Sequence, residues 1–302
     1  MHSLAVALER RVSSMKLLTP DKTIAALEDY VIKPNLLLYP TLGVIIKPGD
    51  KDSPDYIYLR SIEKKAAIYT AKIVVKEAAN YKEAATAIQE LRHDHRINGI
   101  IILSHFDKDV DRALFNMIPP RLDVDCVSAL TFGHLITSHS PVGYRHGPCA
   151  AVAAMKLLEY EGLTDLSEKK VAVIGRSLRV GRPLAEMLTQ NNATVTCFHS
   201  QSGDFENNCE LFDYDIIISA VGKPKIWNLD TCGGGQERYF IDIGINVDEN
   251  GLTCGDFDID SFKNTDISIT PVPGCVGKLA TVVLFAKLYA NAAYVYGDFS
   301  NV

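Results

Sequence analysis

The chain has 302 residues and a formal net charge of −6, from 31 Lys plus Arg against 37 Asp plus Glu. Hydrophobic residues make up 47% and charged residues 23%, proportions that exclude a disordered or fibrous chain. The length is about twice that of a typical domain, so we expect two domains with separate cores. The acidic balance, without a basic run, argues against nucleic acids and membranes as partners.

The first half alternates short apolar runs with helical patterns. Strands are predicted at 42–46, 72–75 and 99–103, and helices at 56–67 and 82–92. The third strand is apolar on both faces, as buried parallel strands are. Repeated alternation of strand and helix predicts an α/β fold, with a parallel sheet covered by helices.

The second half restarts this alternation with clearer turn signals. Its apolar runs predict strands at 171–174, 193–198, 215–222, 239–244 and 267–269. Strands of this length and spacing are typical of a doubly wound nucleotide-binding domain.

The segment from Ser138 to Gly147 is rich in Ser, His, Pro and Gly, so we place the domain boundary there. The first domain then spans 1–147 and the second 148–277. The remaining helix, 278–302, is predicted to cross back and complete the first domain.

The seven cysteines are scattered, with neither a CxxC pair nor zinc-like spacing. They predict free thiols in a reducing compartment. His93 and His95 form a lone HxH pattern without a third ligand, so we expect no metal site. No apolar stretch approaches the roughly 20 residues that a membrane helix needs, and the first residues do not read as a signal peptide. We expect a cytoplasmic protein, with the mitochondrial matrix as the minor alternative.

The strongest local motif is the turn after the strand at 171–174. Gly175 permits a tight turn and Gly181 permits close packing of the following helix. Ser177 stands where a second glycine is usual, but it still offers N–H and hydroxyl donors, and Arg176 lies between. Because the N-terminus of a helix attracts phosphate, this turn predicts a dinucleotide site. A plain strand–helix turn is the alternative.

The cofactor is predicted from the end of the next strand. An NAD site usually has an acidic residue there, but His199 and Ser200 follow this strand and no acid comes before Asp204. Arg176 and Arg179 lie on the neighbouring turn. The pattern favours NADP over NAD, unless these arginines are ordinary surface charges.

Four motifs together resemble the methylenetetrahydrofolate dehydrogenase/cyclohydrolase family. They are Gly175-Arg176-Ser177-x-x-Val180-Gly181-x-Pro183, Asp242-Ile243-Gly244-Ile245-Asn246, Pro271-Val272-Pro273-Gly274-Cys275-Val276-Gly277 and Asp123-Val124-Asp125. Their order and spacing fit from about residue 40 to the end. The resemblance implies an N-terminal α/β catalytic domain that holds tetrahydrofolate and a doubly wound Rossmann-type NADP domain, with a cleft between them. We also expect a homodimer.

The resemblance also implies roles for single residues. Asp125 would accept two N–H bonds from the pterin ring in a planar bidentate pair, whereas by itself it reads as a surface acid. A rigid loop poor in side chains would let a flat ring approach its backbone. That loop is Pro273, Gly274, Cys275, Val276 and Gly277. Ser200, Gly222 and Ile245 are expected to complete the cofactor site.

The catalytic half departs from the family pattern. The family has a Tyr followed four residues later by a Lys, but here Tyr58 is followed by Ile62. A register shifted by two pairs Tyr56 with Arg60 and also yields no lysine. We prefer Tyr58, with Tyr56 kept as a substrate-binding residue.

A second departure lies after the third strand, where the family's Gln is Leu103. We assign catalysis to Tyr58 and Asp125, and substrate contact to Leu103 and the loop at 273–277.

The changes at Ile62 and Leu103 are expected to affect the two reactions of the family differently. Hydride removal from the methylene bridge needs positioning and no proton transfer. Hydration of the product needs an acid/base group, which typically raises the rate roughly 10²–10⁴-fold. The side chain of Ile62 cannot act as such a group. Arg60 stays protonated, and Lys65 is the remaining nearby amine. We therefore expect an NADP-dependent dehydrogenase with weak or lost cyclohydrolase activity. The alternatives are a folate- or dinucleotide-binding protein with little turnover, or an NADP oxidoreductase for another small substrate.

Overall fold

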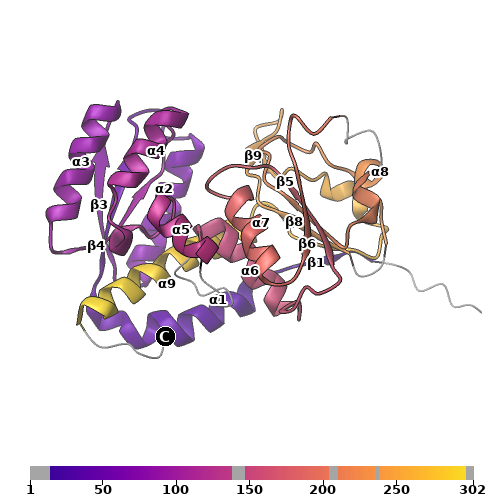
Figure 1. Ribbon diagram of the computed structural model, residues 1–302, viewed down its shortest axis with the longest axis horizontal. Coiled ribbons are helices and arrows are strands. Elements are labelled where there is room, and N and C mark those ends of the chain that lie inside the picture. The colour runs from indigo at the N-terminus through magenta and orange to yellow at the C-terminus, as the bar shows by residue number, and fades with distance from the viewer. Residues whose placement is uncertain (1–13, 138–146, 204–209, 236–237, 297–302) are drawn as a thin grey trace, which may run out of the picture.

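The computed structural model describes residues 14–137, 147–203, 210–235 and 238–296. It has two lobes side by side, each built on a parallel sheet (Figure 1). The predicted boundary lies almost wholly in 138–146, outside the described residues, as do the first 13 residues.

The first lobe holds a three-stranded parallel sheet of order β3-β2-β4. Its strands are β2 (Thr41–Ile46), β3 (Lys72–Glu77) and β4 (Ile97–Ile102). The helices on this lobe are α2 (Pro54–Ile68), α3 (Tyr81–His93), α4 (Lys108–Met117) and α5 (Ala129–Thr137). Every residue of β2 and β4 is buried, which fits their apolar character on both faces.

The second lobe holds a six-stranded parallel sheet of order β1-β11-β8-β7-β5-β6. Its strands are β1 (Lys16–Leu17), β5 (Lys170–Ile174), β6 (Thr194–Phe198), β7 (Ile216–Ser219), β8 (Tyr239–Asp242) and β11 (Ser268–Ile269). The chain runs from β5 outward to β6 and then returns to β7 on the other side. This reversal confirms the predicted doubly wound α/β fold and puts the switch point between β5 and β7.

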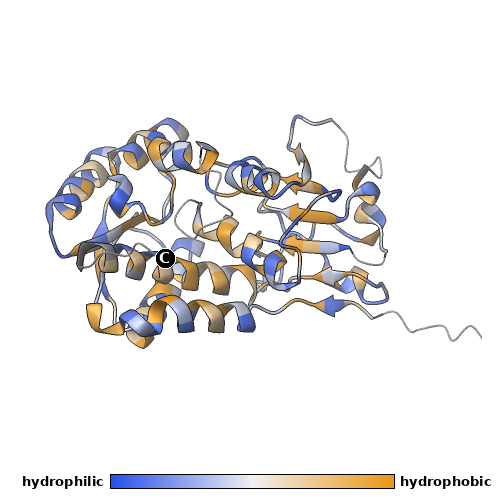
Figure 2. Ribbon diagram, turned by 60° about the horizontal axis from the view of Figure 1, so that its bottom comes forward, coloured by the Kyte–Doolittle hydropathy of each residue, from blue (hydrophilic) through white to orange (hydrophobic). Residues whose placement is uncertain are grey.

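Shorter elements complete the second lobe. They are α6 (Cys149–Tyr160), α7 (Gly181–Gln190), α8 (Leu229–Cys232), and the hairpin of β9 (Asn246–Val247) with β10 (Thr253–Cys254). Figure 2 shows hydrophobic residues along the strands of this sheet and hydrophilic residues on the outer helices. The core therefore lies between the sheets and the helices that cover them.

The N-terminus departs from the predicted division at residue 147. Strand β1 pairs in parallel with β11, so Lys16 and Leu17 belong to the sheet of the second lobe. Because β11 is otherwise an open edge, this strand completes its hydrogen bonding. Helix α1 (Asp21–Leu27) and the short turns at Glu28–Ile32 and Lys33–Leu38 then lead back to the first lobe.

Helix α9 (Val276–Tyr296) runs between the lobes and contacts α1, α2, α6 and β4 (Figure 1). Contrary to the sequence analysis, it is long and apolar enough to cross a membrane by length and composition. However, 83% of its apolar window, Val276–Ala293, is buried inside the protein. This degree of burial is typical of a helix in the core of a protein.

Candidate active site

The ends of β5 and β7 form the first part of the site. Ile174 and Ser219 are register partners, so the turns that follow them lie side by side. Gly175 has φ of +116°, and a Cβ there would lie 2.6 Å from the carbonyl oxygen of Ala220. The turn therefore requires glycine at this position.

Gly181 begins α7 and packs directly on this turn. A Cβ there would lie 2.0 Å from the carbonyl oxygen of Gly175, which is closer than any side chain allows. The Ser177 hydroxyl accepts a hydrogen bond from the backbone N–H of Val180, so it holds the turn together. A cradle without side chains at a helix N-terminus suits a phosphate group, and these residues fit a dinucleotide.

The other predicted cofactor residues lie at the same edge of the sheet. Ser200 follows β6, Gly222 follows β7 and Ile245 follows β8, and all three are exposed. Arg176 is also exposed on the glycine turn. The structure thus places these residues around the carboxyl ends of neighbouring strands, where doubly wound folds bind ligands.

A buried carboxylate that sequence reasoning missed fixes the turn after β7. Asp256 is fully buried and accepts hydrogen bonds from the Ser219 hydroxyl at 2.6 Å and the backbone N–H groups of Val221 at 2.8 Å and Gly222 at 3.1 Å. Its signal in the sequence was weak, because one acid between Gly255 and Phe257 does not reveal such a role. Asp256 therefore holds the loop that faces Gly175.

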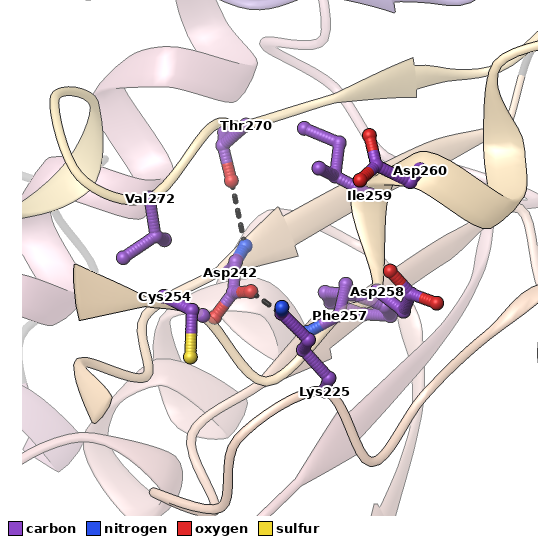
Figure 3. Close-up of a pocket in the computed structure, with 10 residues that line it drawn as sticks. Lys225, Asp242, Cys254, Phe257, Asp258, Ile259, Asp260, Thr270 and Val272 are labelled. Atoms are coloured by element: carbon purple, nitrogen blue, oxygen red, sulfur yellow. Dashed lines mark hydrogen bonds between the residues drawn. The ribbon is translucent and has the colours of Figure 1, made fainter. Parts of the chain in front are cut away.

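Next to this network lies a small pocket, drawn in Figure 3, whose lining includes Lys225, Asp242 and Val272. Asp242 accepts a hydrogen bond from the Phe257 N–H at 2.9 Å, and its own N–H donates to the Thr270 hydroxyl at 2.7 Å. Burial raises the pKa of Asp242 to about 7, although hydrogen bonds from backbone N–H groups such as that of Phe257 lower it. Asp242, the last residue of β8, is thus a titratable carboxyl group next to the turn that follows this strand.

The second part of the site lies where the first lobe faces the glycine turn. Burial raises the pKa of the Tyr58 hydroxyl well above its usual value. Asp125 accepts a hydrogen bond from the backbone N–H of Cys149 at 3.1 Å. Asp125 and Cys149 both act electrostatically on Tyr58. Tyr58 and Asp125 thus come from separate elements and interact electrostatically.

Arg179 lies between these two parts, and its position differs from the expectation of a phosphate contact. It is half-buried, and its Nη2 donates to the carbonyl oxygen of Ile102 at 2.7 Å. Its guanidinium lies 5.1 Å from the ring centre of Phe115. Arg179 therefore points into the first lobe, and Arg176 is the arginine that remains exposed on the turn.

Tyr56 lies apart from Tyr58, so Tyr56 is not among the residues around Asp125. Its hydroxyl donates to Glu77 at 3.0 Å, and the Lys51 ammonium lies 3.9 Å from its ring centre. Two residues along a helix turn the side chain by about 200°, so Tyr56 and Tyr58 face opposite sides. The structure therefore favours the register with Tyr58.

The two positions that depart from the resemblance are apolar and buried. Ile62 is fully buried and Leu103 nearly so, both in the core shared with α9. The amines considered as substitutes lie elsewhere. Arg60 donates to the carbonyl oxygen of Lys51 at 2.5 Å, and Lys65 pairs with Glu28 at 3.6 Å.

The loop before α9 is only partly accessible. Pro273, Gly274 and Gly277 are exposed, whereas Cys275 and Val276 are buried. Burial raises the pKa of Cys275 to about 12, so its thiol is a neutral core group. A Cβ on Gly277 would lie 3.4 Å from the Cδ1 atom of Ile245. The loop predicted to contact folate therefore meets the loop predicted to contact the cofactor.

Known proteins resemble this chain in sequence and in fold. A family model for the tetrahydrofolate dehydrogenase/cyclohydrolase NAD(P)-binding domain matches residues 148–295. The bifunctional protein FolD of Staphylococcus aureus strain JH9 is 35% identical over 257 residues, which cover 83% of this chain and 86% of that protein. The chain belongs to the tetrahydrofolate dehydrogenase/cyclohydrolase family. The predicted resemblance is thereby confirmed.

Solved structures of this family agree with the two-domain fold. The bifunctional FolD enzyme of Campylobacter jejuni is 27% identical and superposes with a TM-score of 0.81, over 92% of this chain and 99% of that one. The Trypanosoma brucei methylenetetrahydrofolate dehydrogenase-cyclohydrolase, solved with NADP and an inhibitor, is 24% identical with a TM-score of 0.79, over 92% and 97%. The second lobe is accordingly the NAD(P)-binding domain of the family.

One further buried residue near Asp125 escaped the sequence analysis. Lys287 is buried on α9, and its ammonium donates to the carbonyl oxygen of Gly147 and contacts the Cys126 sulfur at 3.5 Å. Its signal in the sequence is a lysine in the middle of the apolar run of α9, whose other charged residue, Lys278, lies near the start of the helix. The residues next to Lys287 in the sequence do not indicate which distant residues its ammonium contacts.

Proposed function

We propose that this family member is an NADP-dependent methylenetetrahydrofolate dehydrogenase whose methenyltetrahydrofolate cyclohydrolase activity is weak or lost. The observation that carries the proposal is that Arg179, from the glycine turn of the second lobe, bonds to the Ile102 carbonyl of the first lobe and acts electrostatically on both Tyr58 and Asp125. This link between the lobes supports a folate site close to the cofactor site. Hydride transfer needs that proximity above all else.

The folate would be held mainly by the first lobe. Asp125 offers a carboxylate to two N–H groups of the pterin ring, and Tyr58 orients the ring from α2. The exposed backbone of Pro273, Gly274 and Gly277 leaves space for a flat ring. Leu103 would contribute apolar contact, while the buried Cys275 and Val276 would only shape the loop.

The cofactor would be held by Gly175, Arg176, Ser177 and Gly181, with Ser200, Gly222 and Ile245 at neighbouring strand ends. When bound, the nicotinamide supplies the hydride acceptor. The absence of an acid at His199 and Ser200, together with the exposed Arg176, supports NADP over NAD. The exposed guanidinium suits the extra phosphate of NADP.

The weak cyclohydrolase follows from Ile62 and Leu103. Hydration of the methenyl cation requires a group that accepts and returns protons. Both positions instead carry apolar side chains in the core. Arg60 and Lys65 are engaged with partners on other sides of α2, so neither supports this step.

The same proposal includes a cytoplasmic homodimer that binds neither nucleic acid nor membranes. Strand β3 is an edge of its sheet, and Val75 on this strand and Ile68 nearby are exposed. An open edge with apolar side chains suits pairing with a second copy. Light scattering after size exclusion distinguishes dimer from monomer.

The deciding experiment follows NADP reduction with methylenetetrahydrofolate, with NAD in parallel, and methenyl hydrolysis in a separate assay. We expect reduction of NADP above NAD, and hydrolysis much slower than reduction. Asp125→Asn should raise the KM for the folate. Comparable rates of hydrolysis and reduction would refute the proposed loss of cyclohydrolase.

A second candidate is a binding protein with little turnover, favoured by the joint replacement at Ile62 and Leu103. It predicts tight binding of folate and NADP without reduction. An oxidoreductase for another substrate predicts NADP binding without folate binding. Calorimetric titration of both ligands separates these cases from the dehydrogenase.

A further inference from the structure

A lysine lies buried beside the candidate folate site. Lys287 is 3% exposed, in the middle of the apolar helix α9. Burying an ammonium group is costly unless it is paired and hydrogen-bonded. Its hydrogen bond to the carbonyl oxygen of Gly147 satisfies one donor, and the Cys126 sulfur lies 3.5 Å from the nitrogen.

Both contacts of Lys287 flank Asp125. Cys126 directly follows Asp125 in the chain, and Gly147 stands two residues before Cys149. The backbone N–H of Cys149 donates to Oδ1 of Asp125 at 3.1 Å. The ammonium of Lys287 therefore lies beside the loop that carries Asp125, and the two groups interact electrostatically.

Asp125 is the carboxyl group whose charge acts on this ammonium. Burial raises the pKa of Cys126 to about 11 and that of Cys149 well above its usual value, so both thiols are neutral near pH 7. The nearby Asp123 already accepts hydrogen bonds from the Val127 and Ser128 N–H groups and from the Thr131 hydroxyl. Asp123 thus serves as a cap for its own loop.

Several charged and titratable groups face Asp125 from the elements around it. They are Arg179 from the glycine turn, Lys287 from α9, Cys149 from α6, Tyr58 from α2 and Asp123 with Cys126 from its own loop. Burial raises the pKa of Asp125, whereas Arg179, Lys287 and the Cys149 N–H lower it. Two cations therefore oppose the effect of burial on this carboxyl group.

We propose that Lys287 is a positioning residue for substrate binding: from α9 its buried ammonium holds the Asp125 carboxylate ionised and turned toward the pterin ring. The inference rests on the proposed function, in which Asp125 accepts two N–H bonds from that ring. A protonated carboxyl group cannot accept both bonds, so folate binding weakens as pH falls through the pKa of Asp125.

The sign of the pH effect follows directly. Removing the positive charge of Lys287 raises the pKa of Asp125, so weakening of folate binding begins at a higher pH. An opposite charge nearby typically shifts a carboxyl pKa by about 1–3 units. Each unit corresponds to a tenfold change in the fraction ionised on the acid side.

The test compares Lys287→Gln, which keeps a donor for Gly147 but loses the charge, with Lys287→Arg, which keeps the charge. The control is Lys65→Met, because Lys65 is a half-buried lysine paired with Glu28, away from Asp125. KM and kcat for methylenetetrahydrofolate are measured with NADP between pH 5.5 and 9. Lys287→Met takes the place of the Gln variant if that variant does not fold.

We expect the acid limb of the 1/KM profile to move upward by about one pH unit or more in Lys287→Gln, with kcat changed little. Lys287→Arg should restore the limb, and Lys65→Met should leave it unchanged. An unmoved limb in a folded Lys287→Gln protein overturns the proposal. So does a fall in kcat at constant KM, which would place Lys287 at the reacting atoms.

A second readout does not depend on activity. Carbon-13 NMR of the Asp125 carboxyl group gives its pKa in unaltered protein and in Lys287→Gln, and the value should rise in the variant. In unaltered protein, the nitrogen-15 resonance of the Lys287 ammonium should shift as Asp125 titrates. If both hold while methylenetetrahydrofolate is not oxidised, the proposed function fails and the pairing stands. If neither holds in an active enzyme, the pairing fails alone.

Discussion

The Arg179 guanidinium donates a hydrogen bond from Nη2 to the carbonyl oxygen of Ile102, at 2.7 Å. Arg179 lies on the glycine turn of the second lobe, and Ile102 is the last residue of β4 in the first lobe. The bond therefore joins the carboxyl ends of the two sheets. Because ligands of doubly wound folds bind at such ends, Arg179 connects the candidate cofactor and folate sites.

We expect Arg179→Met to destabilise the protein. The carbonyl of the buried Ile102 would lose its charged donor, which costs about 1–3 kcal/mol of unfolding free energy. Urea denaturation measures the change from the midpoint and slope. Arg176→Met, at the exposed arginine of the same turn, should change stability by less than about 0.5 kcal/mol. Equal destabilisation by both variants would argue against the bond between the lobes.

We expect Arg176→Ala to weaken NADP binding selectively. Loss of a charged contact to the extra phosphate costs about 1.5–3 kcal/mol, which is roughly 10- to 150-fold in Kd. NAD binding should change much less, because NAD lacks this phosphate. Calorimetric titration with both cofactors gives the ratio. If the two affinities fall equally, Arg176 does not contact that phosphate.

We expect Gly181→Ala to abolish measurable cofactor binding. A single Cβ there would lie 2.0 Å from the Gly175 carbonyl oxygen, so the turn must open. Gly133→Ala is the matched control, because a Cβ on Gly133 meets no atom within 4 Å. Circular dichroism checks folding, and fluorescence titration with NADP measures binding. A folded Gly181→Ala protein with unchanged affinity would remove this turn from the cofactor site.

We expect Ile62→Lys to create or raise methenyl hydrolysis while NADP reduction changes little. An amine at this position would supply the missing proton transfer, within the roughly 10²–10⁴-fold that general acid–base catalysis gives. Adding Leu103→Gln should increase hydrolysis further, since the resemblance implies that the family's Gln positions the Lys. Ile62→Met, which lacks the amine, is the control. A matching gain in Ile62→Met would show that repacking is the cause.

We expect Asp242 to make stability depend on pH. Its pKa of about 7 exceeds the usual 3.8, so the folded protein retains a proton that the unfolded chain releases between about pH 4 and 7. The contribution of Asp242 to the unfolding free energy therefore falls as pH rises through that window, by at most about 1.4 kcal/mol per pH unit. Asp242→Asn removes this titration.

Urea denaturation at pH 5, 6 and 7 tests this dependence. Unaltered protein should lose stability relative to Asp242→Asn as pH rises from 5 to 7. Asp260→Asn is the control, because a hydrogen bond from Lys263 lowers the pKa of the exposed Asp260 and it titrates below this window. A constant difference between unaltered protein and Asp242→Asn across the range would contradict the raised pKa.

Much of the fold was predictable because its causes are local. The β-branched runs at 72–75 and 171–174 form strands within two residues of the predicted limits. The described cysteines are free thiols, as predicted, while Cys209 lies outside the described residues. In contrast, α4, α5 and α6 had no prediction, although Asp107 caps α4 and Pro148 precedes α6.

The sequence by itself determined the positions at which a steric constraint acts between residues that are close in the chain. Gly175 and Gly181 are required by a backbone angle and by a contact six residues apart, so their spacing alone predicts the turn. The order of strands and helices likewise follows from local patterns of hydrophobicity and turns.

Only the tertiary structure decided which side chains meet. It turned Arg179 toward Ile102, 77 residues away, and set Lys287 against Cys126, 161 residues away. It also paired β1 with β11 across most of the chain. Such contacts depend on how distant elements pack against each other. A buried charge needs a partner because its burial costs free energy, but the packing decides which residue is within reach.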